Sequence, residues 1–374
     1  MTVYLSSYFF ICLSAIISLF KENNTKFFWY SSLFILILIN TLKWNIGGDW
    51  WVYYDYTIIS KNRSLFQILN VSEPGFMLLT WINSRLNLDL PGINFFASVI
   101  FFLGFQKLLK DQNDRWISLL IILPITYFII FQGYVRQGIA LGFIFFAVAN
   151  LIKRRNYYFL FYIFIAFLFH RSALFCLLFY FHDSLNIKNY INKITNILFI
   201  IISLGVLYIA IPFFKNEINY LYKRFSTDFL LYYTNKNRIS YGAIPRGIIN
   251  ILPAIILILF WKNFLKYKDF SILFLMSIIV FFLFILSFYY STIADRLSVY
   301  LCILQILIYP RFINLISDYK LKYITTLIII LVYIFVFIFY VLFGDNGNQY
   351  ATYSIYLFRD LPSECQLLPY EACK

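Results

Sequence analysis

The sequence predicts an all-α integral membrane protein that crosses a bilayer many times. Three observations support this fold class: 62% of the residues are hydrophobic, 13% are charged, and the apolar residues form runs long enough for membrane-spanning helices. A soluble domain is usually about 45–50% apolar and about 25% charged. We therefore expect residues 1–343 to form one multi-span transmembrane domain and residues 344–374 to form a tail outside the membrane.

About twelve apolar runs are the predicted transmembrane helices. They lie near residues 3–20, 27–43, 92–109, 116–133, 137–152, 157–170, 172–182, 194–214, 246–261, 269–290, 296–310 and 323–343. The first run lacks the basic start and the small-residue cleavage site of a signal peptide, so we expect it to remain as a span. The runs on either side of His170 are shorter than the approximately 20 residues that an α-helix needs to cross a bilayer. They are expected to be tilted or broken helices, or one interrupted element.

Clusters of lysine and arginine predict the orientation of these helices. Membrane proteins concentrate such residues in cytoplasmic loops, so the net charge of +14 indicates topology and not a nucleic-acid partner. The clusters are Lys107, Lys110 and Arg115; Lys153–Arg155; Lys188 and Lys193; Lys262, Lys266 and Lys268; and Arg311, Lys320 and Lys322. With all of them in the cytoplasm, both termini and the longer loops 44–91 and 215–245 lie outside. The stretch "SEPGFMLLTWINSRL" in the first loop is apolar enough for a re-entrant or interfacial helix.

Four short groups of ionisable residues interrupt the apolar runs on the predicted outer side. They are Arg136, His170 with Arg171, Arg246, and Asp295 with Arg296. An ionisable residue at membrane depth is costly and marks a functional site by default, although an arginine at a helix end can also extend to the headgroups. Guanidinium groups prefer phosphate and carboxylate. Arg136, Arg246, Arg296 and, more weakly, Arg171 are therefore predicted to bind a lipid-linked phosphate or pyrophosphate.

The segment "NIGGDWWVYYDYTIIS" in the first outer loop combines flat aromatic rings with carboxylates. Trp50, Trp51 and Tyr54 offer faces on which sugar rings can stack, and Asp49 can accept a hydroxyl proton. The alternative is an aromatic belt, which Trp and Tyr form at any bilayer boundary. The pair Gly47–Gly48 indicates a tight turn, which favours a shaped site.

The two histidines have different predicted roles. His170 lies between two short spans, where a neutral imidazole could take a proton from a sugar hydroxyl as a general base, with Asp49 as the second candidate. A structural histidine bonded to the backbone is the alternative. His182 lies beside the predicted cytoplasmic boundary and is expected to be solvated. Glu73 and Asp295 are expected to orient arginines or to bind sugar.

No spacing of ligands for a metal, no phosphate-binding loop and no dinucleotide fingerprint occurs, so no metal and no tightly bound cofactor is expected. Cys365 and Cys373 lie in the polar tail. They could form a disulfide if that tail faces an oxidising compartment.

Five segments occur in order between roughly residues 47 and 300: "GGDWWVYYDY", "SEPGF", "YVRQGIALGF", "FHRSALF" and "ADRLSVYL". Together they resemble the EpsG-like group of Wzy-type polymerases, which make O-antigens of lipopolysaccharide, capsules and exopolysaccharides. The resemblance implies a GT-C-like, metal-independent glycosyltransferase of the bacterial inner membrane with its active site facing the periplasm. It would move a growing glycan from undecaprenyl pyrophosphate onto a new undecaprenyl-pyrophosphate-linked repeat unit. Implied partners are this lipid-linked oligosaccharide, membrane lipids, a chain-length regulator and a flippase.

The chain departs from one pattern of that group, an arginine followed eleven positions later by glycine. Ala147, Leu257 and Leu307 stand where glycine would follow Arg136, Arg246 and Arg296. Two alternative functions remain at this point. An O-antigen ligase would use the same donor with a different acceptor. A transporter or flippase of lipid-linked oligosaccharide should line a path through the bilayer with polar residues, often in repeated halves.

Overall fold

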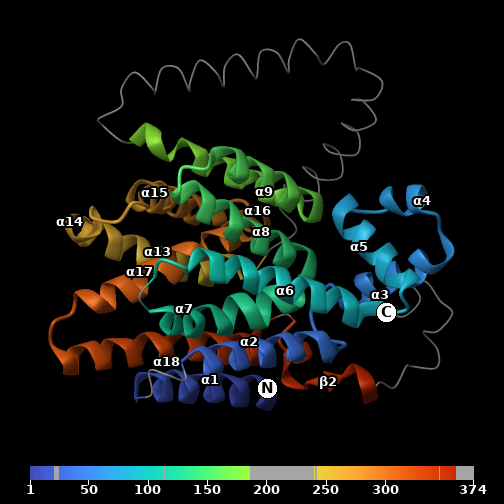
Figure 1. Cartoon of the computed structure of the whole chain (residues 1–374), viewed down its shortest axis with the longest axis horizontal. Helices are drawn as coiled ribbons and strands as arrows, with labels where there is room; N and C mark the ends of the chain where they lie inside the picture. The colour runs from blue at the N-terminus through green and yellow to red at the C-terminus, as the bar shows by residue number, and fades with distance from the viewer. Residues whose placement is uncertain (21–24, 113, 186–239, 241, 345, 359–374) are drawn as a thin grey trace, which may run out of the picture. The chain divides into compact units, whose positions relative to one another are not determined.

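The computed structural model describes residues 1–20, 25–112, 114–185, 240, 242–344 and 346–358 (Figure 1). The chain divides into two compact units. The first comprises Met1–Cys176 together with Gln305–Lys374, and the second comprises Leu177–Leu304. The predicted span at 194–214, most of the predicted loop 215–245, and the cysteine pair Cys365 and Cys373 lie outside the described residues.

Long apolar helices dominate the first unit. They are α1 (Thr2–Phe20), α2 (Thr25–Leu42), α6 (Asp89–Leu108), α7 (Arg115–Ile122) continuing as the π-helix η2 (Leu123–Phe131), α8 (Val135–Ile152), α9 (Asn156–Phe169), α17 (Cys302–Leu315) and α18 (Tyr319–Phe343). Shorter elements join them: β1 (Lys43–Trp44), α3 (Trp50–Asn62), α4 (Leu65–Leu69), α5 (Pro74–Arg85), α19 (Asn348–Ala351), β2 (Ser354–Ile355) and η6 (Tyr356–Phe358).

The second unit contains most of the 3₁₀-helix η3 (Arg171–Leu185), then α13 (Ala243–Leu259), α14 (Trp261–Phe264), α15 (Phe270–Ser287), α16 (Ser291–Ser298) and η5 (Val299–Leu301). Among the described residues of the whole chain, six helices are long and apolar enough to cross a membrane, and four further apolar helices are shorter. The protein is therefore a multi-pass membrane protein, and the predicted spans that fall on described residues coincide with helices.

The helical structure is interrupted at His170, as the two short apolar runs suggested. His170 has an extended backbone (φ −156°, ψ 120°) between α9 and η3. Because a 3₁₀-helix rises about 2.0 Å per residue, the 15 residues of η3 extend about 30 Å, which matches the thickness of a hydrocarbon core. The predicted apolar run within η3, residues 172–182, accounts for about 22 Å of this length, more than the same run would extend as an α-helix.

The two ends of the helix bundle in the first unit carry different segments of the chain. At one end, Arg311 Nε donates to Gln112 Oε1 at 3.1 Å, and Lys153 Nζ lies 3.3 Å from Asp111 Oδ2. These contacts join three of the basic loops that were predicted to be cytoplasmic. At the other end lie α3, α4, α5 and the antiparallel pair β1–β2, so the basic loops and the predicted outer segments are at opposite ends (Figure 1).

The core of this unit is packed tightly enough for backbones to touch. A Cβ placed on Gly104 of α6 would lie 2.1 Å from the carbonyl oxygen of Gly142 on α8. Small residues permit such close approach between membrane helices. Phe101 and Phe131 pack beside this contact, with ring centroids 4.7 Å apart. The first half of α8 is therefore packed closely against α6 and η2.

Candidate active site

Arg136 is the second residue of α8 and follows a sharp change of backbone. The wide turns of η2 end at Phe131, and the link Gln132–Tyr134 leads directly into α8. Wide helical turns of this kind occur often at functional sites. Here the change of helix type and the following turn place the Arg136 side chain at the end of the unit where α3 and α5 lie.

The turn that precedes α3 brings Asp49 to Arg136. Gly47 has φ +104°, a conformation that favours glycine, and a Cβ on it would lie 2.5 Å from Gly133 Cα. The Asp49 amide also donates to the Gly133 carbonyl at 3.4 Å. Asp49 Oδ2 consequently lies 3.3 Å from Arg136 Nη2. The glycine pair therefore forms the predicted turn, and this turn positions the Asp49 carboxylate beside Arg136.

A second carboxylate comes from the residue before α5. Glu73 precedes Pro74, whose fixed φ suits the first position of a helix. Gly75 packs directly on Leu168, because a Cβ on it would lie 3.0 Å from both the Cβ and the carbonyl oxygen of that residue. Glu73 Oε2 lies 2.9 Å from Arg136 Nη1. Arg136, which stands alone in the sequence, is thus paired with two carboxylates in space.

Two hydroxyl groups complete the contacts of this cluster. Ser72 Oγ donates to Glu73 Oε2 at 2.6 Å and accepts from Arg136 Nη1 at 3.1 Å. Tyr53 donates to Asp49 Oδ2 at 3.3 Å, and the Arg136 guanidinium carbon lies 5.6 Å from the centroid of the Tyr53 ring. Among the described residues, the buried Nε of Arg136 has no hydrogen-bond partner.

The electrostatics of the cluster keep Glu73 ionised. Burial alone would raise the pKa of Glu73, but the Arg136 guanidinium, the His170 ring and the Ser72 hydroxyl outweigh it and lower the pKa to about 2. The formal charge of Arg136 with Asp49 and Glu73 is one negative unit. A proton taken up beside these carboxylates would therefore be stabilised.

His170 belongs to the same cluster. Its ring is close enough to Glu73 to lower the pKa of that carboxyl group electrostatically. The ring is buried, and its Nδ1 lies 2.6 Å from Ser172 Oγ. The His170 amide closes the last turn of α9 on Ala166 at 2.9 Å. Arg171 comes next and is half-buried.

The aromatic residues after Asp49 are not all open to a ligand. Trp50 is buried, and its ring stacks on Tyr54 at 5.3 Å and meets the edge of Trp44 at 4.6 Å. Trp51 is half-buried beside Trp50. Tyr54 lines a cavity. Of the rings predicted to bind sugar, Trp50 therefore packs inside an aromatic cluster, whereas Tyr54 also borders a cavity.

The second unit contains another arginine paired with a carboxylate. Arg246, in the first turn of α13, bonds Asp295 of α16, and Ser240 Oγ donates to the same carboxylate oxygen at 2.7 Å. Arg296 follows Asp295 on α16 and is half-buried. Glu73 and Asp295, which were expected to orient arginines or bind sugar, both lie against an arginine.

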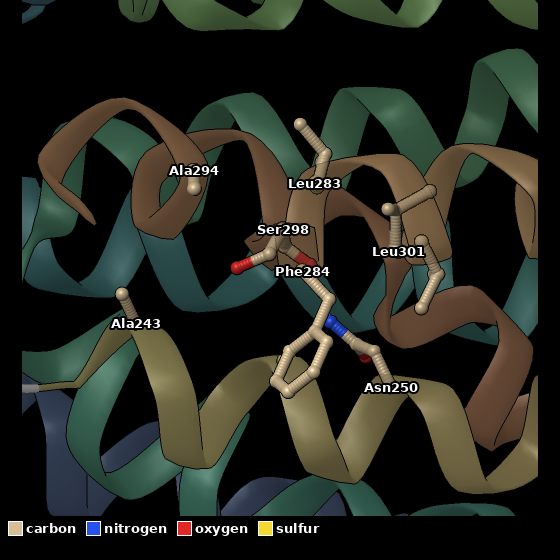
Figure 2. A pocket seen from close by; sticks show the side chains of 9 residues that line it. Ala243, Asn250, Leu283, Phe284, Ala294, Ser298 and Leu301 are labelled. Atoms are coloured by element: carbon tan, nitrogen blue, oxygen red, sulfur yellow. Dashed lines mark hydrogen bonds between the residues drawn. The ribbon is translucent and has the colours of Figure 1, made fainter. Parts of the chain in front are cut away.

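A small cavity lies between α13, α15 and α16 in this unit (Figure 2). Its volume is about 10 Å³, which is room for roughly one water molecule. Apolar side chains such as Leu283 and Phe284 surround it, and Asn250, which bonds the Ser298 carbonyl at 2.9 Å, is one of its polar walls. The cavity is too small for a sugar or a diphosphate.

Sequence reasoning missed three features of these sites. Ser72 precedes Glu73 in "SEPGF", but nothing in the sequence marked its bond to Arg136. Lys43 is buried and donates to the Gln132 carbonyl, and burial lowers its pKa. His182 was predicted to be solvated, which is wrong: η3 continues past it, the ring is buried, and its Nδ1 lies 3.1 Å from the Phe179 carbonyl. Within the described part of the chain, no three metal-ligating side chains are grouped to hold an ion.

Comparison with known proteins identifies one family. The model of the EpsG family matches residues 26–355. This range includes Asp49, Glu73, Arg136 and His170 in the first unit, and Arg246 and Asp295 in the second. No curated protein and no solved structure matches the chain.

Proposed function

Because the chain belongs to the EpsG family, we propose that it is a polysaccharide polymerase that joins lipid-linked repeat units. The observation that carries this proposal is the grouping of His170, Glu73 and Asp49 around Arg136 at one end of a bundle of apolar helices. A base beside fixed charges is what the attack of a sugar hydroxyl requires.

In this proposal the protein lies in the bacterial inner membrane with a GT-C-like arrangement of about twelve spans. The end that carries α3 and α5 faces the periplasm, because the basic loops lie at the opposite end. The growing glycan on undecaprenyl pyrophosphate is the donor, and a new undecaprenyl-pyrophosphate-linked unit of an O-antigen or capsule is the acceptor. A chain-length regulator and a flippase are the proposed protein partners.

His170 is the proposed general base. It accepts the proton of the acceptor hydroxyl while that oxygen forms a bond to the anomeric carbon of the donor. The bond from this carbon to the pyrophosphate oxygen breaks, and undecaprenyl pyrophosphate leaves with the electron pair. The ionised Glu73 stabilises the protonated imidazole. Asp49 is a weaker candidate, because its Oδ2 already accepts bonds from both Arg136 and Tyr53.

The contacts of Arg136 favour a positioning role. Both of its terminal nitrogens already bond carboxylates, and two carboxylates beside a diphosphate would repel it. We therefore propose that Arg136 holds Asp49 and Glu73, and that its Nε donates to an oxygen of the substrate. Stabilising the pyrophosphate leaving group remains the proposed role of Arg171, Arg246 and Arg296. Sugar contacts are proposed for Trp51, Tyr54 and Asp295.

Reconstitution tests this function. Purified protein in lipid vesicles would be given a synthetic repeat unit on undecaprenyl pyrophosphate, without nucleotide or added metal. The expected product is a ladder of glycans that differ by whole repeat units. Transfer only to a lipid A core added to the same vesicles would identify a ligase. Movement of the unlinked substrate across the bilayer, with no new glycosidic bond, would identify a flippase. Either result would overturn the proposal.

A further inference from the structure

A second cavity, in the first unit, lies along a face of α3 that adjoins the face in contact with Arg136. Its volume is about 180 Å³, which is far more than a single water needs. Tyr54, Thr57 and Lys61 of α3 line it, and Trp44, Asp89 and Tyr356 form the remaining walls. The α3 residues recur at the three- to four-residue spacing of one helix face, so this face is continuous along the cavity.

Three aromatic rings form the apolar part of the cavity. Trp44 meets Tyr54 edge-on, with centroids 5.8 Å apart, and meets Tyr356 at 5.4 Å and 70°. The antiparallel pair β1–β2 holds Trp44 and the segment before Tyr356 together, because Trp44 pairs with Ser354. Aromatic faces bury the C–H surface of a sugar ring and leave its hydroxyls at the edge.

The polar part of the cavity offers a donor and an acceptor of opposite charge. Lys61 Nζ lies 2.9 Å from Asp89 Oδ1, and the Tyr356 hydroxyl donates to Asp89 Oδ2 at 3.4 Å. Neighbouring hydroxyls of a sugar can bond such a pair together, one as donor to Asp89 and one as acceptor from Lys61. Since the two charges cancel, the pair favours a neutral ligand over an anionic one.

The backbone around this cavity is held in uncommon conformations. Asn45, Asn87 and Asp89 have φ values of +52°, +54° and +46°. Residues other than glycine rarely adopt such values, and they persist where the surrounding structure requires them, often at ligand sites. Asn45 adjoins Trp44, and Asp89 is itself a wall of the cavity.

We propose that this cavity binds one neutral sugar residue of the lipid-linked glycan and so selects the repeat unit. The inference rests on the proposed function for the origin of that glycan. Tyr53 of α3 contacts Arg136, and the next residue, Tyr54, lines the cavity. The bound sugar is therefore positioned by the same helix that contacts the active site.

Saturation-transfer NMR on the full chain in lipid nanodiscs tests the binding. The probes are glucose, galactose, N-acetylglucosamine and glucuronic acid, each added alone at millimolar concentration. At least one neutral sugar should bind. Tyr356→Ala and Asp89→Asn should each weaken it by about tenfold or more, through loss of a ring face and of a charged acceptor. Tyr157→Ala, which removes a tyrosine that is 90% exposed, is the matched control and should bind like the wild type.

Each other result has a defined meaning. Binding of glucuronic acid alone, no binding of any sugar, or binding that Tyr356→Ala and Asp89→Asn leave unchanged would overturn the inference. The same proteins would also be assayed with the lipid-linked repeat unit. A wild type that binds a neutral sugar at this cavity but forms no polymer would leave the cavity assigned and contradict the proposed function. If Tyr356→Ala and Asp89→Asn bound sugar like the wild type and also formed normal polymer, the result would contradict the assignment of the cavity and leave the proposed function intact.

Discussion

Each unit has an arginine in the first turn of an apolar helix, and the two arginines differ in the number of carboxylates that pair with them. In the second unit Arg246 has one carboxylate partner, Asp295, and the charges cancel. In the first unit Arg136 has two, Asp49 and Glu73, and one negative charge remains. A neutral pair can be purely structural. A cluster with surplus charge beside a buried histidine can stabilise a proton as well, which is the reason for proposing the chemistry there.

The largest expected effect comes from Arg136→Ala. This change leaves two carboxylates facing each other without a cation, and breaking a buried pair costs about 3–5 kcal/mol. We expect no detectable polymer and a clear fall in melting temperature in detergent. The double variant R136A/E73Q should recover part of the stability, because it removes one of the unpaired charges. Normal polymer from Arg136→Ala at normal protein level would contradict the site.

His170→Gln should slow polymerisation by roughly 10²–10⁴-fold, which is the usual contribution of a general base. Glutamine keeps the size and polarity of the side chain, so the melting temperature should change little. Initial rates with the lipid-linked repeat unit measure the effect as a function of pH. The wild-type rate should depend on pH, as expected for a general base, and the variant rate should lack this dependence. A purely structural histidine would lower stability and leave the shape of the pH profile unchanged.

Arg246→Ala should cost less stability than Arg136→Ala, because it leaves one carboxylate unpaired. A loss of about 1.5–3 kcal/mol is expected, as for a hydrogen bond to a charged group. Adding Asp295→Asn should restore most of the melting temperature. If Arg246 also binds pyrophosphate, the double variant will remain slow in polymerisation although it is stable. Full recovery of the rate would assign Arg246 a structural role only.

The smallest effect concerns pH and Glu73. Its pKa is lowered from 4.5 to about 2 in the folded protein, so the unfolded chain binds more protons between these values. The stability that Glu73 contributes is complete above about pH 4.5 and is lost as the pH falls towards 2. The difference in melting temperature between wild type and Glu73→Gln should therefore shrink from pH 6 to pH 3. Asp111→Asn, which removes a mostly exposed carboxylate, should show little difference throughout.

The sequence predicted the long apolar helices among the described residues, because hydrophobic length marks them, but it did not predict α3, which lies within the predicted loop 44–91. It also singled out Arg136 and His170, which are conspicuous among apolar neighbours and which the structure brings together around Glu73. It could not predict that Glu73 and Asp49 share one arginine, because these residues are separated by 24 positions from each other and by more from Arg136. Their contact depends on Gly47 and Gly75, which allow one backbone to touch another. The 3₁₀ form of η3, which buries His182, also had no signal in the pattern of apolar residues.

Two adjoining faces of α3 have different surroundings. Tyr53 contacts Arg136 of the charged cluster, whereas Tyr54, Thr57 and Lys61 line the cavity on the neighbouring face. If the cavity selects the repeat unit as proposed, substitutions on this face change which glycan is accepted while the reacting groups keep their geometry. On that proposal, a few changes along one face of a single helix suffice for a new polysaccharide structure.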